Sequence, residues 1–239
     1  MQAVILAGGL ATRMRPLTET VPKLLLDVAG RPFVDWQLEK LAACGFEDVV
    51  ICIAYLGEQI QEHVGDGARY GVRVRYTNEG TNLLGTGGAL RLALPVLAST
   101  FLVTYGDSYL PFDYQEPVRV LDAHDDCDGV MSVFKNEGRW DPSNVVTDGP
   151  GEWVLRYEKG SSDPAFDHID YGAIALRREV VVAIPADVRS GLETVQHALA
   201  EKKRLRAVRV HDRFFEIGSP EGLAALTKHL SPTSPNDTK

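Results

Sequence analysis

The sequence predicts an α/β protein with a single doubly wound, mostly parallel sheet. Through the first half of the chain, short apolar runs alternate with stretches whose apolar residues recur at helical spacing. The first run, residues 3–6, breaks directly into Gly8-Gly9, which is typical of a strand followed by a ligand-binding turn. Alternating strands and helices favour a parallel sheet covered on both faces, with ligands at the carboxyl ends of its strands.

The expected elements of the first half follow from these patterns. Val34, Leu38 and Leu41 fall on one helical face, and Gly45 closes that helix. Short apolar or alternating runs mark the strands. We expect strands at 3–6, 49–53, 72–76 and 101–105, and helices at 32–44, 58–64 and 86–94.

The second half is richer in strands. Leu192, Val195 and Leu199 mark one helix, and Ser219 with Pro220 begins a last helix. We expect strands at 129–134, 144–146, 153–158, 171–176 and 205–210. Residues 1–230 are expected to form one domain, and residues 231–239, which lack large apolar side chains, a disordered tail.

Composition narrows the class of protein. The 239 residues carry a net charge of −8, which argues against nucleic acid as a partner. No apolar run approaches the ~20 residues of a membrane span, and the N-terminus shows no signal-peptide pattern. Cys44, Cys52 and Cys127 are scattered, as expected of reduced thiols in a cytoplasmic protein.

The loop after the first strand has the features of a triphosphate site. Gly8-Gly9 lets backbone N–H groups approach phosphate oxygens, and Arg13 and Arg15 add positive charge with fork geometry. Lys23 follows Pro22, which holds the chain extended. A glycine pair alone also fits an ordinary turn with solvated arginines. The combination favours phosphate, although neither the P-loop pattern nor the dinucleotide fingerprint occurs.

The stretch LAGGLATRMRPLTETVPKLLLDVAGRP resembles the signature of the sugar-1-phosphate nucleotidyltransferases, or nucleotide-sugar pyrophosphorylases. The resemblance implies a Rossmann-like, GT-A-like fold with a strand-rich sugar-binding part. One departure is Ala11, which stands where the family usually has glycine and adds a methyl group to the loop. The nucleotide-binding residues implied are Leu6, Ala7, Gly8, Gly9, Arg13, Lys23, Gly85, Thr86 and Gly88.

A second glycine-rich turn, LGTGGAL, precedes the helix expected at 86–94. Glycines at a helix start leave amide donors exposed, so this turn suits a flat base edge or an anion as well as a plain helix start. The resemblance places the turn against the nucleobase. The sequence of the turn is most similar to that of guanylyl-transferring and some uridylyl-transferring members of the family.

Two carboxylates are candidate metal ligands. Asp107 follows the strand expected at 101–105, and the carboxyl end of a parallel strand suits Mg²⁺. The resemblance gives this Asp the metal and makes Glu216 the second ligand, although the family usually has Asp there. Mg²⁺ or Mn²⁺ is the expected cofactor, while an isolated Gly-Asp or surface Glu would need no metal.

The resemblance also implies residues for the sugar phosphate. Glu158 would contact sugar hydroxyls and Lys159 the phosphate, for which a lysine charge is suited. Without the resemblance, these two residues are an exposed, charged strand end. The implied set is Asn144, Glu158, Lys159, Asp170 and Gly172.

Taken together, the resemblance implies transfer of a nucleotidyl group from an NTP to a sugar 1-phosphate, with Arg13, Lys23 and Asp107 as catalytic residues. GTP is favoured, with D-glycero-α-D-manno-heptose 1-phosphate or mannose 1-phosphate as acceptor.

One alternative is uridylyl transfer to N-acetylmuramic acid or another amino-sugar 1-phosphate. Another is a non-catalytic nucleotide-sugar sensor. A nicotinamide dehydrogenase would need the glycine-rich dinucleotide-binding fingerprint, which this sequence lacks. Homo-oligomerisation is left open.

Overall fold

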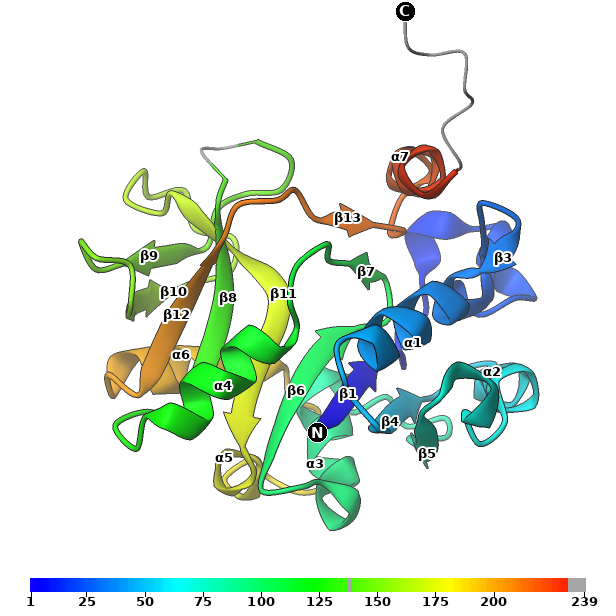
Figure 1. Cartoon of the computed structure of the whole chain (residues 1–239), viewed down its shortest axis with the longest axis horizontal. Coiled ribbons are helices and arrows are strands. Elements are labelled where there is room, and N and C mark those ends of the chain that lie inside the picture. The colour runs from blue at the N-terminus through cyan, green and yellow to red at the C-terminus, as the bar shows by residue number, and fades with distance from the viewer. Residues whose placement is uncertain (137–138, 232–239) are drawn as a thin grey trace, which may run out of the picture.

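A nine-stranded sheet organises the computed structural model, which describes residues 1–136 and 139–231 (Figure 1). Its parallel half contains β6 (Thr100–Tyr105), β1 (Gln2–Leu6), β4 (Asp48–Ile53) and β5 (Arg73–Asn78), in that order. Each neighbouring pair is parallel. The carboxyl ends of these four strands therefore meet at the same edge of the sheet.

The other half continues from β6 through an antiparallel strand. β11 (His168–Arg177) pairs antiparallel with β6 and with β8 (Gly129–Lys135), and β12 (Leu205–Val210) lies parallel to β8. β9 (Val145–Thr147) contacts the first residue of β11 and pairs with β10 (Val154–Tyr157). Parallel pairing joins β6, β1, β4 and β5 in succession and also joins β8 to β12, so the sheet is mostly parallel, as the sequence predicts.

Helices cover both faces because apolar residues alternate between the faces of the strands. Ala3 and Ile5 of β1 face one hydrophobic cluster, and Val4 and Leu6 face the other. The first cluster takes residues from α1 (Phe33–Ala43), α2 (Gly57–Val64), α4 (Gln115–Ala123) and α7 (Pro220–Leu230). The second takes residues from α3 (Gly85–Ala93), α5 (Arg178–Val182) and α6 (Leu192–Glu201).

Every expected strand and helix is present, with ends shifted by at most about three residues. The cap of α7 is also as expected, because Ser219 Oγ accepts a hydrogen bond from Gly222 N at 3.1 Å. The sequence did not predict α4, α5 or the short pairs β7 (Ser108–Tyr109) with β13 (Phe215–Glu216) and β2 (Asp27–Val28) with β3 (Arg31–Pro32). Apart from Ser231, the tail expected to be disordered lies outside the described residues.

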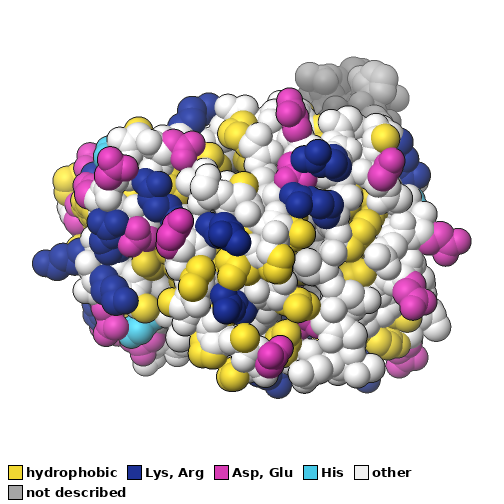
Figure 2. All heavy atoms as spheres, turned by 90° about the horizontal axis from the view of Figure 1, so that it is seen from below, with side chains coloured by type: hydrophobic (Ala, Val, Ile, Leu, Met, Phe, Trp, Pro, Cys, Tyr) yellow, Lys and Arg dark blue, Asp and Glu magenta, His cyan; other side chains and the backbone are white. Residues whose placement is uncertain are grey.

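Among the described helices, none is both long and apolar enough to cross a bilayer. Figure 2, a view from below Figure 1, shows lysine and arginine side chains interspersed with acidic ones over that face. On the face shown, the lysine and arginine side chains do not form the continuous basic stripe that is typical of a nucleic-acid-binding face.

Candidate active site

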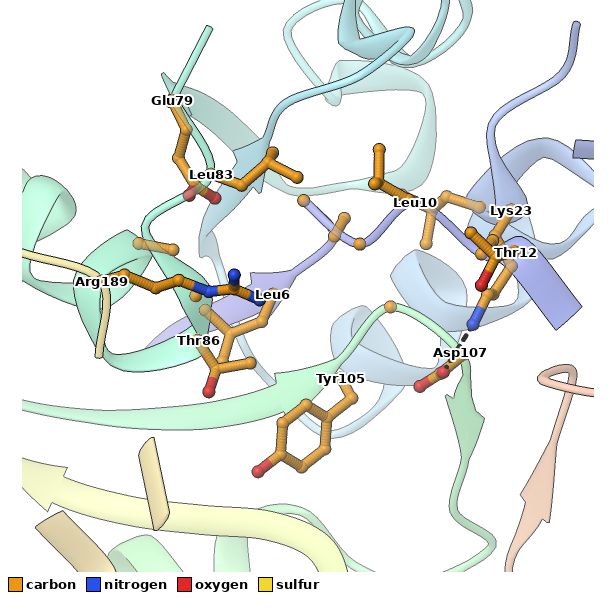
Figure 3. A pocket seen from close by; sticks show the side chains of 18 residues that line it. Leu6, Leu10, Thr12, Lys23, Glu79, Leu83, Thr86, Tyr105, Asp107 and Arg189 are labelled. Atoms are coloured by element: carbon orange, nitrogen blue, oxygen red, sulfur yellow. Dashed lines mark hydrogen bonds and ion pairs between the residues drawn. The ribbon is translucent and has the colours of Figure 1, made fainter. Parts of the chain in front are cut away.

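A cavity of about 430 Å³ lies where β1 and β6 end and α3 begins (Figure 3). This is the edge at which ligands bind in open parallel sheets. Most of the residues implied for nucleotide binding line it, whereas Arg13 and Gly88 do not. The lining members of that set are Leu6, Ala7, Gly8, Gly9, Lys23, Gly85 and Thr86.

The two glycines after β1 have different surroundings. A Cβ on Gly8 would lie 2.5 Å from Glu79 Oε1, so a side chain there would displace the carboxylate. A Cβ on Gly9 would meet nothing within 4 Å, and this residue borders open space in the cavity. A side chain at Gly8 would thus push aside the end of the Glu79 side chain, while Gly9 leaves the backbone accessible to a ligand.

Ala11 adopts a left-handed backbone conformation, with φ 48° and ψ 39°. This conformation costs a non-glycine residue roughly 1–2 kcal/mol, which explains why glycine is usual here in the resembled family. The Ala11 carbonyl is held in place, because it accepts hydrogen bonds from Thr18 Oγ1 at 2.8 Å and Met14 N at 3.0 Å. The methyl group thus strains the loop without preventing its turn.

Lys23 and Asp107 meet at one end of the cavity. Lys23 Nζ lies 2.9 Å from Asp107 Oδ2, and the two side chains are 18% and 30% exposed. Pro22 is extended, as expected, and Lys23 starts a single 3₁₀ turn, Lys23–Leu25. One glycine, Gly106, separates Asp107 from the end of β6. The structure therefore brings the predicted lysine and carboxylate into direct contact at the edge of the cavity.

Glu216 lies beside Asp107 through backbone pairing. Glu216 of β13 pairs with Ser108 of β7, and Ile217 N donates to Asp107 O at 2.9 Å. Burial raises the pKa of Glu216 to about 7, helped by the negative charges of Asp107 and Asp141. The charges of Arg13 and Lys23 act in the opposite direction.

This carboxylate pair fits a divalent cation. Two oxygen-donor side chains lie together, and the anionic form of Glu216 is destabilised by its neighbour's charge, which a cation would offset. Among the described residues, no group of three or more His, Cys, Asp or Glu side chains could hold a metal. The site therefore suits an ion that keeps several waters or takes ligands from phosphate oxygens, as Mg²⁺ does.

Arg13 lies at these carboxylates, outside the cavity lining. A side chain on Gly218 would begin 3.7 Å from Arg13 Nη2 and 3.9 Å from Asp107 Oδ2. The Arg13 side chain is exposed. Its guanidinium is thus next to the charged end of the cavity, where it can reach an outer phosphate.

The second glycine-rich turn is organised differently from the sequence expectation. Gly87 N and Gly88 N both donate to Ser190 O, at 2.9 and 3.1 Å, so these amides do not face a base. Thr86 Oγ1 accepts from Leu192 N at 2.8 Å. Gly88 is needed for packing, because a Cβ there would lie 2.6 Å from Leu84 Cβ. Of the predicted base-facing residues, Gly85 and Thr86 line the cavity and Gly88 does not.

The opposite end of the cavity holds residues that the sequence reasoning missed. Glu79, Leu83 and Arg189 gather there, away from Lys23 and Asp107 (Figure 3). Glu79 directly follows β5, so the rule that singled out Asp107 after β6 also applies to it. Arg189 lies between α5 and α6, and no local pattern marks it as a ligand-binding residue.

Three of the residues implied for the sugar phosphate form a cluster on the other half of the sheet. Asn144 Oδ1 accepts from Asp170 N at 2.8 Å, and Asp170 Oδ1 accepts from Gly172 N at 3.0 Å. Burial raises the pKa of Asp170, opposed by its hydrogen bonds and by the charge of Lys159. Lys159 and Glu158 are exposed just beyond β10.

Gly172 is required by the backbone of β11. Its φ is +100°, and the β11–β8 register shifts between Asp170 and Ile174, which marks an irregularity in the strand. A Cβ there would lie 3.5 Å from Ser108 Oγ, next to Asp107. Tyr105 connects the two regions, because it lines the cavity and its buried hydroxyl has its pKa raised by burial and by nearby charges that include Asp170 and Asp107.

Comparison with known proteins agrees with this geometry. The family model described as nucleotidyl transferase matches residues 2–231. The N-acetylmuramate alpha-1-phosphate uridylyltransferase of Neisseria meningitidis is 48% identical over 115 residues, which cover 48% of this chain and 50% of that protein. The mannose-1-phosphate guanylyltransferase of Mycobacterium tuberculosis is 32% identical over 98% of this chain and 66% of that protein.

Among solved structures, HddC from Yersinia pseudotuberculosis complexed with GMP-PN has a TM-score of 0.75 and 26% identity, and the match covers 95% of this chain and 98% of that one. The curated relatives extend further than this match. The chain spans about half of the Neisseria protein's length and 66% of the Mycobacterium protein's.

Proposed function

Because this chain belongs to the nucleotidyl transferase family, we propose that it transfers a nucleotidyl group from an NTP to a sugar 1-phosphate and releases pyrophosphate. The observation that carries this proposal is the convergence of Gly9, Lys23 and Asp107 on one cavity at the carboxyl ends of parallel strands. The cluster around Asn144 and Asp170 lies on the neighbouring half of the sheet. A sugar 1-phosphate bound there would approach the end of the cavity that holds Lys23 and Asp107.

The proposed reaction needs no general base. A phosphate oxygen of the sugar 1-phosphate attacks the α-phosphorus of the NTP, and the bond to the departing pyrophosphate breaks. The attacking oxygen is already anionic near neutral pH, so catalysis consists of positioning and charge neutralisation. Arg13 would bind the leaving phosphates, and Lys23 the charge that builds on the α-phosphate. Lys159 would orient the attacking phosphate.

Asp107 and Glu216 would hold the divalent metal ion, which we propose to be Mg²⁺ or Mn²⁺. When bound, the ion supplies positive charge to the phosphate oxygens. Lys23 Nζ, now paired with Asp107, would exchange part of that interaction for the incoming phosphate. The same set of side chains thus serves the empty and the occupied site.

We propose GTP as the nucleotide and a heptose or mannose 1-phosphate as the acceptor. The guanylyltransferase relative from Mycobacterium matches 98% of this chain, and the structural match to HddC with GMP-PN covers 95% of it. Uridylyl transfer to an amino-sugar 1-phosphate is the second candidate. It is favoured by the higher identity, 48%, to the Neisseria enzyme over about half of the chain.

The free thiols at Cys44, Cys52 and Cys127 fit a reducing compartment, and we propose a cytoplasmic location.

One screen separates the candidate substrates. Pyrophosphate release should be measured for each of the four NTPs against a panel of sugar 1-phosphates. Preferred use of UTP or CTP over GTP by about tenfold or more would contradict guanylyl transfer and leave the reaction class standing. Nucleotide binding without pyrophosphate release from any pair would favour the sensor.

A further inference from the structure

Resting on the metal-dependent transfer proposed above, we propose that Gln37 is a positioning residue, which sets the affinity of the Asp107–Glu216 pair for its divalent cation. Gln37 lies on α1, is 2% exposed and contacts the turn that joins β6 to β7 (Figure 1). Its Nε2 donates to Tyr105 O at 2.8 Å and to Ser108 O at 2.9 Å. Both acceptors are carbonyl groups of the turn that carries Asp107.

The two carbonyl groups lie where strand pairing stops. Because Ile217 N donates to Asp107 O at 2.9 Å, the alternation of antiparallel pairing makes Ser108 and Glu216 a non-hydrogen-bonded pair. The Ser108 carbonyl therefore points away from β13. The pairing of β6 with β11 ends at Thr104, one residue before Tyr105. Gln37 thus supplies hydrogen bonds that the strands leave open on either side of Asp107.

These contacts connect Gln37 to both carboxylates. The backbone of Asp107 is held toward β13 by Ile217 N, and the carbonyls on either side of it are held toward α1 by Gln37. Since β13 carries Glu216, the same amide also braces the strand pair that places Glu216 beside Asp107. Mg²⁺ demands near-ideal octahedral geometry, so a small shift between two carboxylate ligands weakens its binding.

Core stability alone gives little reason for an amide at this position. The other buried residues of α1 are the apolar Phe33, Val34, Leu38 and Leu41. The Oε1 atom of Gln37 is buried and has no hydrogen-bond partner among the described residues, which costs free energy. The nitrogen must face the turn, because the amide oxygen would repel two carbonyl oxygens. What this amide does provide is a fixed geometry around Asp107.

A purely structural role for Gln37 predicts different behaviour. Gln37→Met nearly keeps the length of the side chain and removes both N–H donors. If only stability depends on Gln37, the protein unfolds more easily, but its folded form binds the cation as wild type does. If Gln37 positions Asp107, the folded form itself binds the cation more weakly. Metal affinity is therefore the informative readout, and it can be measured without turnover.

The test is binding of Mn²⁺ alone to the full chain, followed by loss of the electron paramagnetic resonance signal of the free ion. Loss of a group that orients a metal ligand typically weakens metal affinity 10–100-fold, so Gln37→Met should raise the Kd for Mn²⁺ about tenfold or more. In pyrophosphate release, the Mg²⁺ concentration that gives half-maximal rate should rise by a similar factor, and saturating Mg²⁺ should restore most of the rate.

Gln2→Met is the matched control. Gln2 is 4% exposed, donates to Asp48 Oδ2 at 2.7 Å and to Val96 O at 3.0 Å, and lies at the opposite end of β1 from the cavity. Gln2→Met should therefore lower the free energy of unfolding and keep the wild-type Kd for Mn²⁺. An equal loss of Mn²⁺ affinity in this control would assign the effect to general destabilisation and overturn the proposal.

Folded Gln37→Met protein with wild-type affinity for Mn²⁺ would overturn the proposal directly. If Gln37→Met does not fold, Gln37→Asn supplies the comparison, because it keeps the amide donors but holds them one methylene farther from the turn. Wild-type Mn²⁺ affinity in that variant would overturn the proposal as well. Wild-type protein that releases pyrophosphate but binds no Mn²⁺ would overturn it and leave nucleotidyl transfer standing. Failure of the proposed function has another signature, namely Gln37-dependent Mn²⁺ binding with no pyrophosphate release from any NTP and sugar 1-phosphate.

Discussion

Lys23 is the residue whose position most directly implies a catalytic charge. Its ammonium lies 2.9 Å from Asp107 Oδ2 at the edge of the cavity. Lys23→Ala should lower kcat on the order of 10²-fold or more, because it removes one donor to the charge of the transition state. Steady-state pyrophosphate release measures this directly.

Folding should be little affected by that change. The Lys23–Asp107 pair is partly exposed, so its loss should lower the free energy of unfolding by less than about 1 kcal/mol. Lys228→Ala, an exposed lysine near the end of α7, is the matched control and should leave kcat unchanged. Near wild-type turnover in Lys23→Ala would remove the assigned role.

Ala11 gives a prediction in which the substitution raises the stability of the protein. Its left-handed backbone is strained for alanine, so Ala11→Gly should raise the free energy of unfolding by up to about 1 kcal/mol, after the extra chain entropy of glycine is subtracted. Denaturant unfolding measures the change, and Gly9→Ala, at a glycine of the same loop that lies outside the left-handed region, is the control that should show no strain. A Ala11→Gly protein less stable than wild type by more than about 1 kcal/mol would contradict the strain argument.

At single residues, the sequence predicted what depends on local chain chemistry. Lys23 and Asp107, which meet at the cavity, could be proposed because a proline-lysine pair and a strand-end carboxylate are visible in the sequence. The amide of Gly88 was misjudged because its partner, Ser190 O, comes from a distant segment. Arg189 was missed for the same reason, since its place in the cavity depends on how α5 and α6 dock.

At the scale of elements, two very short strands make the carboxylate pair. β7 and β13 contribute two residues each, and their pairing brings Glu216 beside Asp107. A two-residue strand has no periodicity, so the apolar pattern could not predict either strand. The resemblance to the nucleotidyltransferases named Glu216, and the structure supplies the reason that it lies there.

The carboxylate pair yields a metal prediction. Activity should require Mg²⁺ or Mn²⁺ and vanish with EDTA. Asp107→Asn should abolish turnover, because the amide lowers the ligand charge that binds the cation. Asp122→Asn on the exposed side of α4 is the control and should behave like wild type. Undiminished pyrophosphate release from metal-free protein would refute the two-carboxylate site.

The helix α4 shows a different limit of sequence reasoning. Its buried residues are Pro117, Val118 and Leu121, a short stripe interrupted by a proline. Proline is tolerated there because it lies in the first turn, where its missing N–H has no intrahelical partner. A sequence pattern this short does not distinguish a helix from a loop, and packing against β8 and β11 decides the outcome.

At the scale of the whole molecule, the proposed function divides two tasks between the halves of the sheet. β6, β1, β4 and β5 carry the cavity proposed for the nucleotide, and β11 with β8 to β10 carries the cluster around Asp170. The alternation of strands and helices was enough to predict the parallel half. The antiparallel direction of β11 was not predicted, because apolar periodicity does not depend on strand direction.

This separation predicts that the two substrates can be impaired independently. Lys159 lies beyond β10, on the half of the sheet proposed for the acceptor, and its charge opposes the rise that burial causes in the pKa of Asp170. Lys159→Ala should therefore raise KM for the sugar 1-phosphate about tenfold or more, the cost of one charge-assisted contact, while KM for the NTP stays unchanged. Lys202→Ala, exposed at the end of α6, is the matched control. If Lys159→Ala instead raised KM for the NTP and spared the acceptor, the division of the sheet into nucleotide and acceptor halves would be wrong.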